Sequence, residues 1–228
     1  MWQKLFDELG PRGLDIVTIA MDSGGAEAAA PWIAAAHPRH PSLIDRSHRM
    51  GEHFGVMNVP SGIWINEAGR IVRPPETAYP RRPDFLDEVI RADATPEELR
   101  GIKAVRKLRV NAEGYIAALR DWVEKGAESR YALPAEEVVH RSRPRPLEAA
   151  TAAAHFELGQ HLYVAGYAET AVEHFRRAYH LQPENWTYKR QAWNLLAPGQ
   201  TALEVYGGNW LADVEKIGAE NYYPKVEL

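Results

Sequence analysis

A proline stands directly in front of a strand pattern in the N-terminal half of the chain, and this arrangement restricts the fold more than any other feature. Ser61–Asn66 (SGIWIN) is an apolar β-type run, Pro60 precedes it, and Glu67–Gly69 separates it from a second run at Arg70–Pro74. Because proline removes a hydrogen-bond donor from a sheet, it is tolerated at a strand's first residue, at an edge or in a special turn. The pattern predicts a β-hairpin that begins at Pro60.

The residues before this hairpin alternate between helix and strand patterns. Apolar residues recur at helical spacing over Trp2–Leu9, and Leu14–Asp22 is a continuous β-branched run of the kind that is buried in a parallel sheet. An alanine-rich helix with Pro31 near its middle, a short strand at Ser42–Asp45 and a helical turn at Ser47–Phe54 are predicted to follow.

The order of these elements, closed by a predicted amphipathic helix at Phe85–Ala92, resembles the thioredoxin-like fold, and in particular its TlpA/ResA and peroxiredoxin-like branch. In that family the proline before the third core strand has a cis peptide bond and contacts the substrate thiol. The resemblance implies that Val59–Pro60 is this cis bond and that it belongs to a substrate-positioning loop. It also implies that Trp64 lies in the core.

The departure from the family concerns its chemistry. The 228 residues include no cysteine, which excludes disulfides, thiolate metal sites and thiol chemistry within this chain. Thioredoxin-like enzymes carry a CxxC-type motif after their first core strand, and this sequence begins after that point. In the family's sheet the absent strand lies between those matched here by Asp15–Ala20 and Ser61–Asn66. Without it, a slot of ~10 Å lined by unpaired backbone groups would remain, so we expect an incomplete, altered version of the fold.

Three explanations of the missing strand stay open. The chain is truncated by a misplaced start at Met1, another segment or subunit supplies the strand, or the sheet rearranges into a degenerate domain. We favour truncation, because Met1 falls where the family's first helix should already be under way. A selenocysteine codon read as a stop upstream would produce such a start. The chain itself is expected to contain no catalytic residue, and it is a thiol-disulfide oxidoreductase only if an upstream cysteine or selenocysteine motif exists.

Helical patterns dominate from residue 93 onward. Thr95–Glu98 combines a capping residue, a proline at the first helical position and acidic residues in the first turn, which together predict a helix start. Helical spacing then continues to Val123, with an interruption expected within Asn111–Gly114. The proline-rich segment Ser142–Glu148 is the predicted boundary to a last helical region.

One motif after this boundary is specific. Eight residues resemble the tetratricopeptide repeat at its expected spacings: Leu158, Gly159, Leu162, Gly166, Ala171, Phe175, Ala178 and Pro183. The small residues let two helices lie close together, Phe175 fills the gap, and Pro183 ends the second helix. Since one repeat cannot bury its face alone, we expect a capping helix at Trp186–Leu196. This helical hairpin either binds a protein or peptide, or it only covers the sheet or a second copy of the chain.

The remaining candidate sites are less specific. His37, His40, His48 and His53 match no standard metal-ligand spacing, so they are expected to be surface histidines and no metal site is predicted. Asp22–Gly25 is interpreted as a helix cap. The aromatic residues of the C-terminal segment, Tyr206, Trp210, Tyr222 and Tyr223, are expected to pack on the helical layer. No serine, histidine and acid grouping supports hydrolysis.

The resulting prediction is an incomplete α/β thioredoxin-like domain at residues 1–92, a connecting helical segment at 93–143 and an all-α, TPR-like region at 144–228. The function implied is thiol-disulfide or peroxide redox chemistry when full length. The alternative is a non-catalytic interaction module. No cofactor is expected, and the net charge of −4 without a basic run predicts no nucleic acid or membrane partner. The chain as written has no signal segment and is expected in the cytoplasm, whereas a truncated N-terminus would leave the compartment open.

Overall fold

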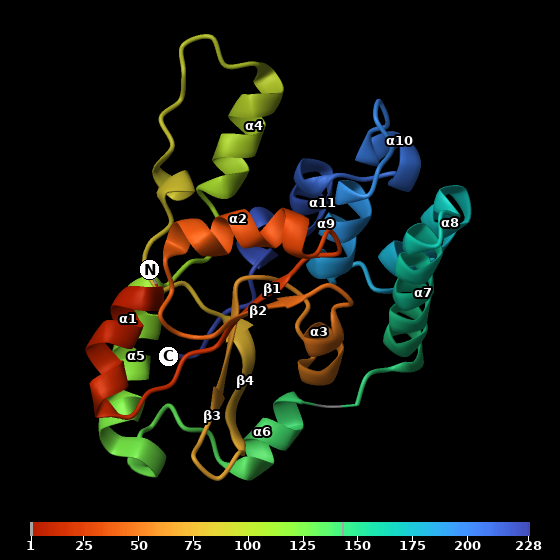
Figure 1. The fold of residues 1–228 in the computed structure, drawn as a ribbon. Helices are drawn as coiled ribbons and strands as arrows, with labels where there is room; N and C mark the ends of the chain where they lie inside the picture. Colours follow the sequence, from red (N-terminus) through yellow and green to blue (C-terminus); the bar gives the residue numbers. More distant parts are fainter. Residues whose placement is uncertain (1, 143) are drawn as a thin grey trace.

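The computed structural model describes residues 2–142 and 144–228 (Figure 1). Its N-terminal half contains four helices, two short strand pairs and single-turn 3-10 helices. In chain order the elements are α1 (Trp2–Leu9), a 3-10 turn (Gly10–Arg12), β1 (Thr18–Met21), α2 (Ala26–Ala36), β2 (Ser42–Asp45), α3 (Arg49–Phe54), β3 (Ser61–Ile65), β4 (Ile71–Thr77), a 3-10 turn (Asp84–Asp87) and α4 (Pro96–Val105).

The remainder is helical. It comprises α5 (Ala112–Lys125), a 3-10 turn (Gly126–Glu128), α6 (Ala135–Arg141), α7 (Leu147–Val164), α8 (Ala168–Leu181), α9 (Trp186–Asn194), α10 (Ala202–Tyr206), α11 (Trp210–Ile217) and a 3-10 turn (Ala219–Asn221). Among the described residues no helix is long and apolar enough to cross a membrane. The chain is thus a mixed α/β protein with a mainly helical C-terminal region from α7 to α11.

The four strands form two separate two-stranded sheets. β1 and β2 are parallel, with Thr18 opposite Ser42 and Met21 opposite Asp45. β3 and β4 are antiparallel, with Ser61 opposite Thr77. Within residues 2–142 and 144–228, no further strand joins either pair. The structure thus confirms the mixed α/β class, and its described strands form two small sheets instead of one.

The first strand is shorter than its sequence pattern. The apolar run predicts a strand over Leu14–Asp22, but pairing with β2 is confined to Thr18–Met21. Leu14 and Ile16 instead pack against the cluster that surrounds Trp64 and Tyr115. Their apolar side chains are used for a different contact, because tertiary packing decides whether a β-type run pairs along its whole length.

The predicted helix at Phe85–Ala92 is wrong. The structure has a 3-10 turn at Asp84–Asp87, and Glu88 leaves the helical conformation with ψ 129°. Leu86 is the buried residue of this turn, whereas Val89 remains 80% exposed. A short amphipathic helix needs a surface to cover, and the chain here offers one only to Leu86.

The segment between residues 95 and 125 contains two helices. Thr95 and Glu98 form the predicted cap, since the hydroxyl of Thr95 accepts from the N–H of Glu98 and the carboxylate of Glu98 accepts from the N–H of Thr95. Asn111 caps α5 by accepting from the N–H of Gly114 at 3.0 Å. Figure 1 shows α1 and α5 side by side, and Arg120 of α5 pairs with Glu8 of α1.

Three apolar cores hold these elements together. One joins α1, α5 and the hairpin around Trp64, and a second lies within α7 to α10 around Phe156 and Phe175. The third brings together Leu86, Leu108, Trp186, Leu211 and Tyr222. Residues from all three predicted segments share this third core. The predicted boundary at residues 142–148 includes residue 143, which, like Met1, lies outside the described residues.

Candidate functional site

The loop before β3 is the predicted substrate-positioning element, and its Val59–Pro60 peptide bond is cis, as expected. Two hydrogen bonds set its conformation: the side-chain oxygen of Asn58 accepts from the N–H of Val59 at 2.9 Å, and the hydroxyl of Ser61 donates to the carbonyl of Asn58 at 2.7 Å. Asn58 is buried, whereas Val59 and Pro60 are half-buried. Part of the loop is therefore open to solvent.

The helical region binds the carbonyl groups of this loop. The N–H groups of Trp186 and Thr187, at the start of α9, donate to the carbonyl of Met57 at 2.7 and 3.2 Å. Arg190 and the hydroxyl of Tyr223 donate to the carbonyl of Val59 at 3.4 and 3.3 Å. The predicted positioning loop is thus engaged by the chain's own C-terminal half.

The tetratricopeptide-like residues are mostly brought together. Gly159 of α7 faces Phe175 of α8 so closely that a Cβ atom on Gly159 would lie 2.8 Å from its ring. Ala171 and Ala178 are fully buried beside Phe175, and Leu162 packs against the same cluster. The other three positions lie outside this core: Leu158 is 42% exposed, Gly166 lies in the turn with φ +89°, and Pro183 follows the end of α8.

Two of the four histidines expected at the surface are buried. His37 and His53 are exposed, but His40 is 7% and His48 only 1% exposed. His48 is buried because α7 covers it, with the Phe156 ring 5.2 Å away. No group of three metal-ligating side chains occurs in the part of the chain that the structure describes.

A polar cluster missed by the sequence analysis surrounds His48. The ring Nε2 lies 3.3 Å from the hydroxyl of Ser23, which also accepts from Gln160 of α7 at 2.7 Å. The main-chain N–H of Ser23 donates to Gln191 of α9 at 2.9 Å. Burial lowers the pKa of His48, and the carboxylates of Asp45 and Asp22 oppose this shift only in part.

This cluster lies at the carboxyl ends of β1 and β2, where open α/β sheets commonly bind ligands. A signal for it was present in the sequence, since Ser23 and His48 each follow a predicted strand within three residues. The structure joins them with glutamines from α7 and α9. A serine and a neutral histidine could exchange a proton, but among the described residues the ring Nδ1 meets no hydrogen-bond partner that would orient it as a general base. The cluster therefore lacks a complete nucleophilic set.

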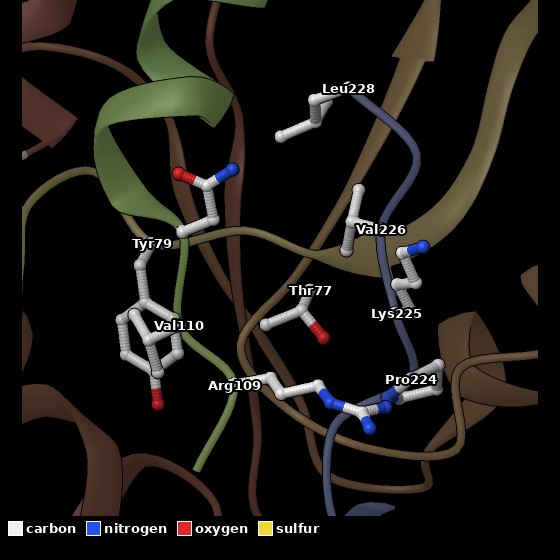
Figure 2. Close-up of a pocket in the computed structure, with 9 residues that line it drawn as sticks. Thr77, Tyr79, Arg109, Val110, Pro224, Lys225, Val226 and Leu228 are labelled. Carbon is white, nitrogen blue, oxygen red and sulfur yellow. The ribbon is translucent and has the colours of Figure 1, made fainter. Parts of the chain in front are cut away.

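A hollow of about 300 Å³ lies between the end of β4, the start of α5 and the C-terminal residues. Figure 2 shows Val110 on one side of it and the segment from Pro224 to Leu228 on the other. Its lining contains two cationic side chains, Arg109 and Lys225, but no carboxylate, histidine or serine. The hollow thus has two cations on its lining, and no histidine or side-chain carboxylate that could serve as a base for the hydroxyls of Thr77 and Tyr79.

Comparisons of the chain with protein-family models, with curated proteins and with solved structures give no match. The class of protein it belongs to must be argued from its own residues.

Proposed function

We propose that this chain is the larger part of a thioredoxin-like redox protein, whose first core strand and redox residue come from a segment upstream of Met1. One observation carries the proposal: β1 and β3 each have one edge without a strand partner among the described residues. The parallel pair is also open to solvent, since Leu43 of β2 and Val17, the residue before β1, are more than half exposed. Parallel strands are normally buried on both faces.

The direction of the backbone groups identifies the open edges. Thr18 donates to Pro41 on the β2 side, so the alternate residues Val17 and Ile19 direct their backbone groups to the other edge. On the hairpin, the carbonyl of Pro60 and the N–H of Asn66 bond to the β4 side. The backbone groups of Ile63 therefore face away from β4. A strand parallel to β1 and antiparallel to β3 would pair with both edges.

In this proposal the upstream segment supplies a cysteine or selenocysteine at the carboxyl end of its strand. Val59 and Pro60 then position the partner's thiol or disulfide, and the present chain alone carries out no redox step. Because the carbonyl of Val59 is bonded to Arg190 and Tyr223, the partner contacts Pro60 or displaces one of these side chains.

The intact mass and N-terminal peptide of the protein from its source test this directly. We expect a mass above 25.7 kDa and an upstream peptide with cysteine or selenocysteine. The 228-residue chain should not reduce insulin with dithiothreitol as electron donor, whereas the longer form should, and a serine in place of its redox residue should abolish the activity. A native N-terminus at Met1, or insulin reduction by the 228-residue chain, would contradict the proposal.

The second candidate function is a non-catalytic interaction module, and the outer face of α7 favours it. This face carries five residues at spacings of three and four, none of them an acidic residue, lysine or arginine: Leu147, Thr151, Ala154, Leu158 and His161. Leu147 is 78% exposed. A solvent-facing helix surface normally carries charged residues, so this one suits a protein or peptide partner. If Met1 is the native start, Leu158→Glu should abolish binding of such a partner, and Glu157→Gln should not.

A further inference from the structure

Gln191 contacts the outer edge of β1 with both polar atoms of its side-chain amide. Its Oε1 accepts from the main-chain N–H of Ser23 at 2.9 Å, and its Nε2 donates to the carbonyl of Met21 at 3.4 Å. In a parallel ladder, a residue of one strand faces residue i of its neighbour. It donates to the carbonyl of residue i−1 and accepts from the N–H of residue i+1. The amide of Gln191 bonds to the carbonyl before Asp22 and to the N–H after it. It therefore makes the two hydrogen bonds that a residue of a parallel strand facing Asp22 would make.

The bonded groups belong to the edge that β2 leaves open. Thr18 and Ala20 direct their backbone groups towards β2, since the N–H of Thr18 donates to the carbonyl of Pro41 at 3.0 Å. Successive strand residues face opposite edges, so Ile19 and Met21 face away from β2. Gln191 thus occupies the carboxyl end of the open edge, and the backbone groups of Val17 and Ile19 have no backbone partner within the described ranges.

The helical region holds this amide in place. Gln191 is only 6% exposed, and the first turn of its helix is fixed by the bonds from Trp186 and Thr187 to the carbonyl of Met57. On the other side of Ser23, Gln160 of α7 and His48 bond to its hydroxyl. The position of the amide is therefore set by two helices and a loop, and does not depend on the rotamer of an exposed side chain.

We propose that Gln191 is an edge cap, which takes the place of a parallel strand beside Asp22 at the end of β1, so that a strand added to this edge pairs with Val17 and Ile19 but not beyond them. Unpaired edges are templates for strand addition, and proteins block them with covering elements. The occupant whose pairing Gln191 limits is an extended apolar segment parallel to β1, because the residues whose backbone groups face this edge, Val17, Ile19 and Met21, are apolar. This proposal does not rest on the redox function.

Two variants of the full chain test it. Gln191→Met has nearly the same shape and loses both hydrogen bonds, whereas Gln191→Glu keeps the acceptor for Ser23 and loses the donor. The probe is a fluorescein-labelled peptide with the sequence of residues 15–21, DIVTIAM, and its control has proline in place of the central threonine. Amide exchange at Ser23 is measured by NMR, and peptide binding by fluorescence anisotropy.

We expect Gln191→Met to raise the exchange rate at Ser23 and the affinity for the peptide by about tenfold each, as the loss of two ordinary hydrogen bonds predicts. Gln191→Glu should keep Ser23 protected and bind the peptide with an intermediate affinity. Gln200→Met should change neither quantity, because the side chain of Gln200 accepts from the N–H of Ala197 within its own turn, far from β1 in the sequence.

The proposal is overturned if Gln191→Met has the same amide exchange rate at Ser23 and the same peptide affinity as the wild type. It is also overturned if the proline-containing peptide binds as tightly as the DIVTIAM peptide. Circular dichroism establishes that the variants are folded. Should Gln191→Met be unfolded, equal peptide affinities of the wild type and Gln191→Glu overturn the proposal instead.

Discussion

The guanidinium of Arg73 lies 5.4 Å from the centre of the Trp64 ring, on the opposite strand of the hairpin, and is 1% exposed. It pairs with Glu76 and donates to the carbonyls of Tyr131 at 3.0 Å and Glu227 at 2.7 Å. One buried cation therefore joins the hairpin to a loop and to the C-terminal segment, which lie far apart in the sequence.

Replacing this cation should destabilise the whole molecule. Arg73→Ala leaves Glu76 and two carbonyls without their partner, so we expect the free energy of unfolding to fall by about 3–5 kcal/mol. Urea unfolding followed by circular dichroism measures the change. Arg70→Ala, at the exposed hairpin turn, should stay within about 0.5 kcal/mol of the wild type. Equal effects of the two variants would contradict this account of Arg73.

Two glycines in helices should respond to alanine in opposite ways. A Cβ on Gly159 would lie 2.8 Å from the Phe175 ring, so Gly159→Ala should destabilise by about 1–3 kcal/mol. A Cβ on Gly101 in α4 meets no atom within 4 Å, so Gly101→Ala should stabilise by up to about 1 kcal/mol. Thermal unfolding of both variants checks the pair. A stabilising Gly159→Ala would mean that α7 and α8 are not closely packed at this point.

Stability should fall on mild acidification because of His48. Burial lowers its pKa in the folded state, while the unfolded chain binds the proton near pH 6.5. The stabilisation is therefore complete above about pH 6.5 and is lost as the pH falls from there towards the folded pKa, by up to ~1.4 kcal/mol per pH unit.

Urea unfolding of the wild type, His48→Asn and His53→Asn between pH 7.5 and 5 tests whether His48 causes the pH dependence. His48→Asn should flatten the dependence, because asparagine does not titrate and tolerates the left-handed backbone at this residue, φ 56°. His53→Asn, at an exposed histidine in α3, is the matched control for the substitution itself. An unaltered slope in His48→Asn would show that other groups cause it.

The buried pair Lys189–Asp213 should behave non-additively. The ammonium lies 2.8 Å from the carboxylate and within 4.6 Å of the centres of the Trp186 and Tyr179 rings. Asp213→Leu alone leaves a buried cation unpaired and should cost about 3–5 kcal/mol, whereas the double variant Lys189→Met/Asp213→Leu should recover most of this loss. A double-mutant cycle by chemical unfolding measures the coupling, and strictly additive losses would contradict it.

Local patterns were sufficient for many elements. The helices Trp2–Leu9 and Ala26–Ala36, the strand Ser42–Asp45 and the hairpin after Pro60 were predicted because each has its own periodicity and its own terminating residues. Phe85–Ala92 failed because an amphipathic pattern indicates a helix only where a surface receives its apolar face. The burial of His48 was missed because the residues that cover it lie more than 100 positions away along the chain, in α7.

By itself, the sequence determined the alternation of helices and strands, the absence of thiol chemistry within the chain and the close packing of the α7–α8 hairpin. Those properties follow from residues close to one another or from composition. Only the tertiary structure decided that the strands form two sheets, that α9 bonds to the loop before β3, and that Gln191 meets the edge of β1. The contacts of α9 and of Gln191 join segments more than 100 residues apart, and their formation depends on how whole apolar surfaces fit together, which no local pattern records.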